Sequence, residues 1–145
     1  MSSRDFEPVL MIWDYYDGVR SGLTECNGRP HYFNCLWDEP KGNYSEKFEL
    51  SPIDASFLKA ATTQWNIYRE WELKFHTGLV QLETHPGNRG VNQEYDNLED
   101  ILHKKLKTLI KLKHEFSAKF RPLPNQDSLP TGVWRDLEVQ WEELK

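Results

Sequence analysis

Three polar residues of the types that line small-ligand pockets lie in the first quarter of the chain: Asp14, Ser21 and Asn34. If two tight turns separate them, their carboxylate, hydroxyl and amide groups share one face of a sheet. Tyr16, Glu25 and Tyr32 fall on the same face. Polar groups that converge beside apolar side chains are typical of ligand pockets, whereas a cross-strand hydrogen-bond ladder is the commoner arrangement on a sheet. We therefore treat these six residues as a hypothetical ligand or partner surface, with the ladder as the alternative.

Metal-binding patterns are weak throughout the chain. The pair Asp14 and Asp17 has a spacing that could hold Mg²⁺, but Asp17 precedes a glycine and fits a turn, so Asp14 lacks a predictable partner. Asp100-x-x-His103 resembles half of a di-metal site, yet no Glu-x-x-His appears elsewhere. His103 and His114 would lie about 16 Å apart on one helix, too far to share a metal. We predict no metal site and no cofactor.

A basic segment, residues 103–121, holds seven of the 18 basic residues and a single acidic residue. This asymmetry suggests phosphate or nucleic-acid contact through Lys104, Lys107 and Lys111. However, acids followed by lysines are also the distribution that a helix dipole favours, and no aromatic residues alternate with the lysines. We retain anion contact as a weak alternative and expect nucleic acid not to be a partner.

No signature of a catalytic nucleophile is present. The chain lacks a Gly-x-Ser-x-Gly elbow, a phosphate-binding loop and a Cys-x-x-Cys motif. We therefore predict no catalytic residue and lean against an enzyme. The enzyme alternative is a small hydrolase with a site near Asp14, with His85 as a second group.

The composition indicates one soluble globular domain over residues 1–145. With 38% hydrophobic and 13% aromatic residues the chain is not disordered, and we expect an aromatic-rich core. The net charge of -5 gives no general attraction to nucleic acid or anionic membrane. No apolar run approaches the roughly 20 residues that span a bilayer, and the first residues do not resemble a signal peptide. We expect a cytoplasmic protein without membrane contact.

Two tight-turn dipeptides organise the N-terminal third: Asp17-Gly18 and Asn27-Gly28. Both are preferred in two-residue hairpins, so they predict a meander with strands at 9–16, 19–26 and 29–37. A fourth strand is expected near 44–50 because aromatic and polar residues alternate there. This register separates Cys26 and Cys35 by about 20 Å, whereas a disulfide needs about 7 Å, so both should be free thiols.

The predicted pairing sorts side chains onto two faces. Trp13 is expected opposite Gly22, and Gly22 opposite Phe33, which defines the core face. That face comprises Val9, Met11, Trp13, Tyr15, Gly22, Thr24, Cys26, His31, Phe33, Cys35 and Trp37, continued by Tyr44, Phe48 and Leu50. The opposite face is mixed, with an apolar band of Ile12, Tyr16, Leu23 and Tyr32 beside the polar row.

Helical periodicity appears in the second half. Apolar residues at helical spacing predict helices at 51–75, with Ser51 as the N-cap, and at 95–120. A short strand at 79–83 and an irregular connector at 121–132 are also expected. Residues 133–144 fit either a strand or a helix, and their aromatic and β-branched content favours a strand. The predicted class is α+β: an antiparallel meander of about four strands, with a C-terminal fifth as an option, packed against two long helices.

These observations favour a small binding or protein-interaction module that uses the mixed sheet face, with a protein or a small molecule as its partner. A small hydrolase and an anion-binding protein are the alternatives. A homodimer, in which acidic and basic regions meet across a two-fold axis, is a further option.

Overall fold

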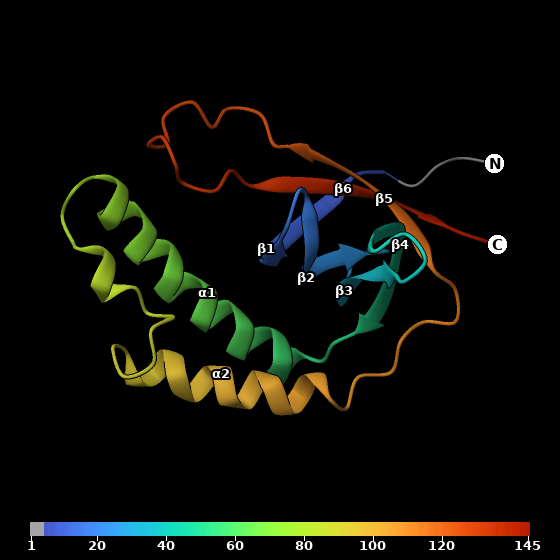
Figure 1. Ribbon diagram of the computed structural model, residues 1–145, viewed down its shortest axis with the longest axis horizontal. Coiled ribbons are helices and arrows are strands. Elements are labelled where there is room, and N and C mark those ends of the chain that lie inside the picture. Colours follow the sequence, from blue (N-terminus) through green and yellow to red (C-terminus); the bar gives the residue numbers. More distant parts are fainter. Residues whose placement is uncertain (1–4) are drawn as a thin grey trace. The chain divides into compact units, whose positions relative to one another are not determined.

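The computed structural model describes residues 5–145, which form six strands, two α-helices and one short 3₁₀ helix (Figure 1). The elements are β1 (Glu7–Tyr15), β2 (Val19–Cys26), β3 (Arg29–Asp38), β4 (Asn43–Pro52), α1 (Ala55–His76), η1 (Leu82–Thr84), α2 (Gln93–Leu106), β5 (Phe116–Pro122) and β6 (Leu137–Glu143). All strand pairs are antiparallel. The strands form a closed barrel in chain order, in which β6 returns to pair with β1.

The predicted fold class is therefore wrong: the sheet is a closed six-strand barrel and not a four-strand meander packed against two long helices. The error lies mainly in the expected helix at 95–120. The second helix ends at Leu106, and Phe116–Pro122 forms β5. Phe116, Ala118 and Phe120 pack in or against the barrel core at every second residue, which is the strand period. Burial inside a closed sheet overrides the local helical spacing of this segment.

The chain forms two compact units. The barrel unit contains the described residues up to Ile53, together with Leu109–Pro124 and Asp136–Lys145. The helical unit contains Asp54–Thr108 and Asn125–Arg135, so it is built from the β4–β5 connection and from the loop before β6. None of the helices in residues 5–145 has both the length and the apolar character needed to cross a bilayer.

The predicted two-residue turn at Asn27-Gly28 is present, with Cys26 opposite Arg29, but the first connection is longer: Tyr15 lies opposite Val19, so Tyr16, Asp17 and Gly18 join β1 to β2. Asp17 and Asn27 have φ values of 53° and 56°, in the left-handed region that Asp and Asn tolerate. The β2–β3 ladder has the predicted register, with Gly22 opposite Phe33 and Ser21 opposite Asn34. Asp14 also lies opposite Ser21, as expected.

The register of β1 differs from the prediction on both sides of Asp14, since Tyr15 and not Tyr16 lies opposite Val19. Bulges shift the pairing, so Ile12 and not Trp13 lies opposite Gly22. A shift of one residue exchanges the two faces of a strand. Ile12 consequently packs against the barrel core, while the ring of Trp13 lies 5.8 Å from that of Tyr32, a residue of the opposite face. The expectations that Trp13 belongs to the core and Ile12 to the mixed face are wrong.

Gly22 allows β1 and β2 to approach closely. A Cβ atom at this position would lie 2.2 Å from the carbonyl oxygen of Met11, far inside van der Waals contact. The β1 backbone therefore occupies the space beside Gly22.

The barrel interior is rich in aromatic side chains, as the composition predicts. Phe33 and Trp141 are fully buried, with ring centroids 5.6 Å apart. Trp141 lies on β6, so residues 137–143 form the strand that their composition favours. The Nε1–H of Trp141 donates to the hydroxyl of Thr24 at 3.2 Å. Tyr15 and Trp37, expected in the core, are instead about half exposed at the strand ends.

The two cysteines, Cys26 and Cys35, are both buried and both free thiols, as predicted. Burial raises the pKa of Cys35, and the neighbouring guanidinium of Arg20 partly offsets this shift. Cys35 lies on β3 and donates to the backbone oxygen of Ser45 on β4.

Side chains at the helix starts cap both helices of the helical unit. Asp54 accepts a hydrogen bond from the N–H of Phe57 at 2.7 Å, and Asn92 accepts one from Tyr95 at 2.9 Å. The predicted cap, Ser51, instead lies in β4 opposite Tyr32. The expected strand at 79–83 is absent, since the ordered element there is the 3₁₀ turn η1.

Candidate functional site

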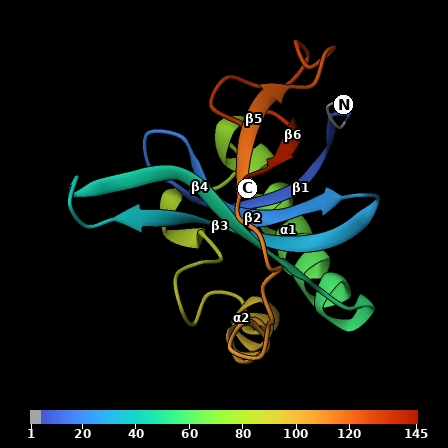
Figure 2. The ribbon, with the colours of Figure 1, turned by 90° about the vertical axis from the view of Figure 1, so that its right-hand side faces the viewer.

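The connectivity of the barrel places two hairpin tips at one end. Consecutive antiparallel strands reverse direction, so the β1–β2 turn and the β3–β4 turn lie at the same end, and the β2–β3 turn lies at the other. Figure 2 shows the β1–β2 and β3–β4 tips projecting on the same side of the barrel. Residues before and after these turns are thereby brought together from separate parts of the sequence.

Three aromatic residues meet at this end and form what we call the aromatic cluster: Tyr16, Trp37 and Tyr44. The ring of Tyr44 lies 5.2 Å from that of Trp37, edge to face, and 6.4 Å from that of Tyr16. Tyr16 is 68% exposed and Trp37 is 50% exposed. Aromatic side chains grouped at the surface provide a large apolar contact area with polar tips, which is typical of interaction sites.

Arg20 holds the cluster together. Its guanidinium carbon lies 4.5 Å from the centroid of the Tyr44 ring, within cation–π distance. The same group donates to the backbone oxygens of Tyr16 at 2.7 Å and of Asp17 at 3.0 Å, and contacts the sulfur of Cys35 at 3.8 Å. The Arg20 side chain therefore links the β1–β2 tip to β3 and β4. These contacts restrict the motion of the hairpin tip, so a ligand that binds there has less conformational entropy to remove.

Acidic residues flank the aromatic cluster. Four acids lie at the two hairpin ends: Asp14, Asp17 and Glu39, which are exposed, and Asp38, which is half-buried. The basic residues of the same two ends are Arg20 and Lys41. Within residues 5–145 none of the four acids forms an ion pair. Asp38 accepts a hydrogen bond from the N–H of Lys41, which stabilises the β3–β4 turn. The hairpin end consequently carries an excess of uncompensated negative charge.

The polar row predicted from the sequence forms across the first three strands. The hydroxyl of Ser21 donates to the carboxylate of Asp14 at 2.8 Å, and Asn34 lies opposite Ser21. Ser21 is nearly inaccessible, with 2% of its surface exposed. The direct Asp14–Ser21 bond is the contact expected of a hydrogen-bond ladder.

The other three residues of the hypothetical surface lie apart from one another. Tyr16 is at the hairpin tip, in the aromatic cluster. Glu25 lies opposite Pro30, towards the β2–β3 turn at the other end of the barrel. Tyr32 is half-buried, and its pKa is raised mainly by this burial, with further contributions from the negative charges of Asp14 and Glu49.

The lysine-rich segment is not one helix. Lys104 lies in α2, Lys107 is its C-cap, and Lys111 follows in the barrel unit. Lys111 forms an ion pair with Glu49 on β4 at 2.5 Å, and this contact raises the pKa of Lys111. All three lysines are exposed, so anion contact stays a prediction for them.

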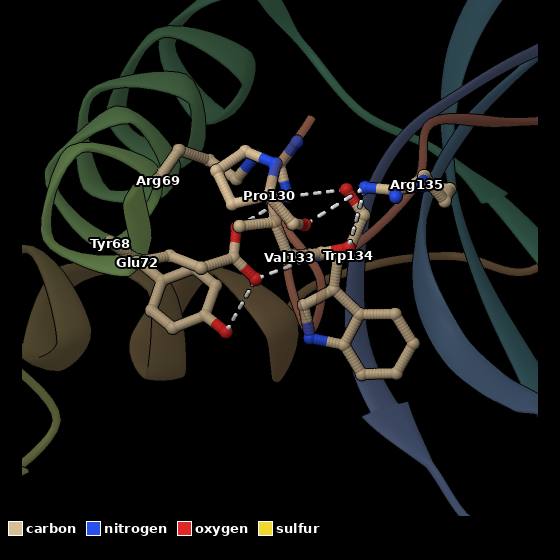
Figure 3. A network of polar contacts seen from close by, with 7 residues as sticks. All are labelled: Tyr68, Arg69, Glu72, Pro130, Val133, Trp134 and Arg135. Atoms are coloured by element: carbon tan, nitrogen blue, oxygen red, sulfur yellow. Dashed lines mark hydrogen bonds and ion pairs between the residues drawn. The ribbon is translucent and has the colours of Figure 1, made fainter. Parts of the chain in front are cut away.

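A buried polar network in the helical unit was missed by the sequence analysis (Figure 3). Glu72 of α1 is 1% exposed. Its carboxylate accepts hydrogen bonds from Arg69 at 2.6 Å, from the backbone N–H of Trp134 at 2.9 Å and from the hydroxyl of Tyr68 at 3.3 Å. Burial and this carboxylate raise the pKa of Tyr68 to about 12. Both carboxylate oxygens have protein partners, which indicates a structural role.

Two sequence-based alternatives, a metal site and a hydrolase site near Asp14 and His85, involve His, Asp and Glu side chains. In the described part of the chain, no group of three His, Cys, Asp or Glu residues is arranged to hold a metal ion. His85 packs against the rings of Tyr68 and Trp71 in the helical unit, at 5.6 and 4.5 Å, while Asp14 belongs to the barrel unit.

Comparison with protein-family models, with curated proteins and with solved structures finds no match to this chain. Function is therefore inferred from the local chemistry of the site. Trp37 and Tyr44 were expected on the core face, and Arg20 was not among the predicted site residues. The signal that could have found them is the up-and-down topology, which brings the first and third turns of a meander to one end.

Proposed function

We propose that the protein is a small binding or protein-interaction module whose contact surface is the aromatic cluster at the hairpin end of the barrel. The exposure of Tyr16 and Trp37 around the ring of Tyr44 carries this proposal. Tyrosine and tryptophan are the residues that contribute most to binding energy at interfaces. The Arg20 contacts that fix the hairpin tip support a surface formed before a partner arrives.

The aromatic cluster is better suited to contact than the mixed sheet face that the sequence suggested. On that face Leu23 is fully buried and Ser21 nearly so, and Ile12 packs against the barrel core. The polar row contributes indirectly to the proposed surface. The Ser21 hydroxyl donates to the carboxylate of Asp14 and so orients this exposed acid near the hairpin tip.

Selection from a random peptide display library tests this function. We expect binders to the full chain that lose binding to Trp37→Ala, since this side chain is exposed and its removal leaves the core intact. Ile110→Ala is the matched control, because Ile110 is another exposed apolar residue, at 82%, outside the cluster. Failure to obtain any binder sensitive to Trp37→Ala and insensitive to Ile110→Ala would refute the proposed surface.

A further inference from the structure

We infer that the partner of the aromatic cluster is a proline-rich segment that carries arginine or lysine. This inference rests on the proposed function and specifies its ligand class. It follows from two properties of the hairpin end: the aromatic cluster, in which Tyr16 and Trp37 are exposed, and an excess of acidic side chains around this cluster.

The ring geometry suits a polyproline II helix. The rings of Tyr16 and Trp37 both lie beside that of Tyr44, at centroid separations of 6.4 and 5.2 Å. One turn of a polyproline II helix, roughly 9 Å long, is long enough to contact two of these rings. Such helices dock into grooves lined by aromatic rings, and they lose little entropy because they are already extended in solution.

The charge around the aromatic cluster selects the residues that flank the prolines of the partner. Asp14, Asp17 and Glu39 are exposed and free of ion pairs in the described residues. A cationic side chain beside the prolines would pair with these carboxylates or stack on an exposed ring. The same carboxylates repel phosphate groups, so a nucleic acid stacking its bases on the rings is disfavoured.

The test uses three blocked synthetic peptides of about twelve residues, enough for several polyproline II turns. The first combines prolines with two arginines, the second replaces the arginines by glutamate, and the third keeps the arginines but replaces the prolines by serine. Binding to the full chain is measured by calorimetry and by the shift of the Trp37 indole N–H resonance, assigned with Trp37→Phe. A short oligothymidine strand is titrated in parallel.

We expect only the arginine–proline peptide to bind and to shift the Trp37 resonance. Trp37→Ala should weaken binding by about tenfold or more, as for an aromatic hot spot. Asp17→Asn should weaken it by about threefold, because a flanking charge contributes less than a central ring. Asparagine tolerates the positive φ of this position, so the variant keeps the turn. Ile110→Ala should bind as the unmodified protein does.

Equal binding of the glutamate or the serine peptide would overturn the inference, as would tighter binding of oligothymidine. So would the absence of binding by all three peptides. If display selection still yields peptides that depend on Trp37, the proposed contact surface stands and only its ligand class is wrong. If selection yields none, the proposed function itself fails.

Discussion

The backbone N–H of Trp134 donates to Oε2 of Glu72 at 2.9 Å, which ties the loop preceding β6 to α1 within the helical unit. Arg69 completes the connection, since its guanidinium donates both to Glu72 and to the backbone oxygen of Trp134. One buried carboxylate thus satisfies partners on a helix and on a loop 62 residues away in sequence (Figure 3).

Replacing Glu72 by alanine should strongly destabilise the protein. Removing one member of a buried, hydrogen-bonded ion pair typically costs about 3–5 kcal/mol, and the 20% exposure of Arg69 places the expected loss near the lower limit. Urea unfolding followed by circular dichroism measures the free energy of unfolding. Glu70→Ala, an exposed acid on the same helix, is the control and should change it by about 0.5 kcal/mol or less. Equal effects of the two substitutions would contradict the structural role of Glu72.

Stability should fall in alkaline solution partly because of Tyr68. The folded protein raises the pKa of this hydroxyl to about 12, through burial first and the Glu72 charge second. In the unfolded chain a tyrosine hydroxyl has a pKa of about 10. As the pH rises, Tyr68 therefore loses its proton in the unfolded state before it does so in the folded state. The contribution of Tyr68 is therefore complete below about pH 10 and is lost as the pH approaches about 12.

Comparing the intact protein with Tyr68→Phe isolates this effect. We expect the free energy of unfolding of the variant to decline less steeply above about pH 10, because phenylalanine has no proton to lose. Glu72→Gln should lie between them, since it removes the charge but leaves Tyr68 buried. Parallel pH profiles for the intact protein and Tyr68→Phe would argue against the raised pKa.

Gly22→Ala should disrupt the contact between β1 and β2. The added methyl group would lie 2.2 Å from the Met11 backbone oxygen, so the two strands must separate. Overpacking of this kind costs about 1–3 kcal/mol, and the involvement of backbone on both strands favours the upper limit. Gly28→Ala is a suitable comparison, because its Cβ would meet nothing within 4 Å and only its φ of +75° opposes the substitution. That strain should cost about 1–2 kcal/mol. A smaller loss for Gly22→Ala than for Gly28→Ala would show that the strands do not approach so closely.

Thr24→Val should weaken the barrel although it preserves the shape of the side chain. The Thr24 hydroxyl accepts a hydrogen bond from the fully buried indole of Trp141 and donates to a backbone oxygen, such as that of Pro8 at 3.1 Å. Valine leaves the indole N–H without this acceptor, which should cost about 1–3 kcal/mol. Thermal or urea unfolding of Thr24→Val and Thr24→Ser gives the comparison. Serine retains the hydroxyl, so the hydrogen-bond explanation requires that Thr24→Ser lose less stability than Thr24→Val. A larger loss for Thr24→Ser would contradict it.

Local chemistry in the sequence was sufficient for the first hairpins. Asp-Gly and Asn-Gly favour positive φ, so the chain reversals at Asp17 and Asn27 and the pairing of Gly22 with Phe33 were predictable, although the first connection has three residues and not two. The free state of both cysteines followed from the same register. The strand at the C-terminus followed from alternation of aromatic and β-branched residues.

Tertiary structure alone decided the closure of the barrel and the position of the candidate site. Phe116 has helical spacing relative to Leu109 and Leu112, so the local pattern favours a helix. Only the pairing of its segment with β4 and β6 buries Phe116 in a strand. The bulges in β1 lie beside the close approach at Gly22, and they move Ile12 inward and Trp13 outward. Tyr16, Trp37 and Tyr44 meet because the β1–β2 and β3–β4 connections lie at one end of the barrel. Turn preferences depend on neighbouring residues, whereas burial and the meeting of side chains depend on distant ones.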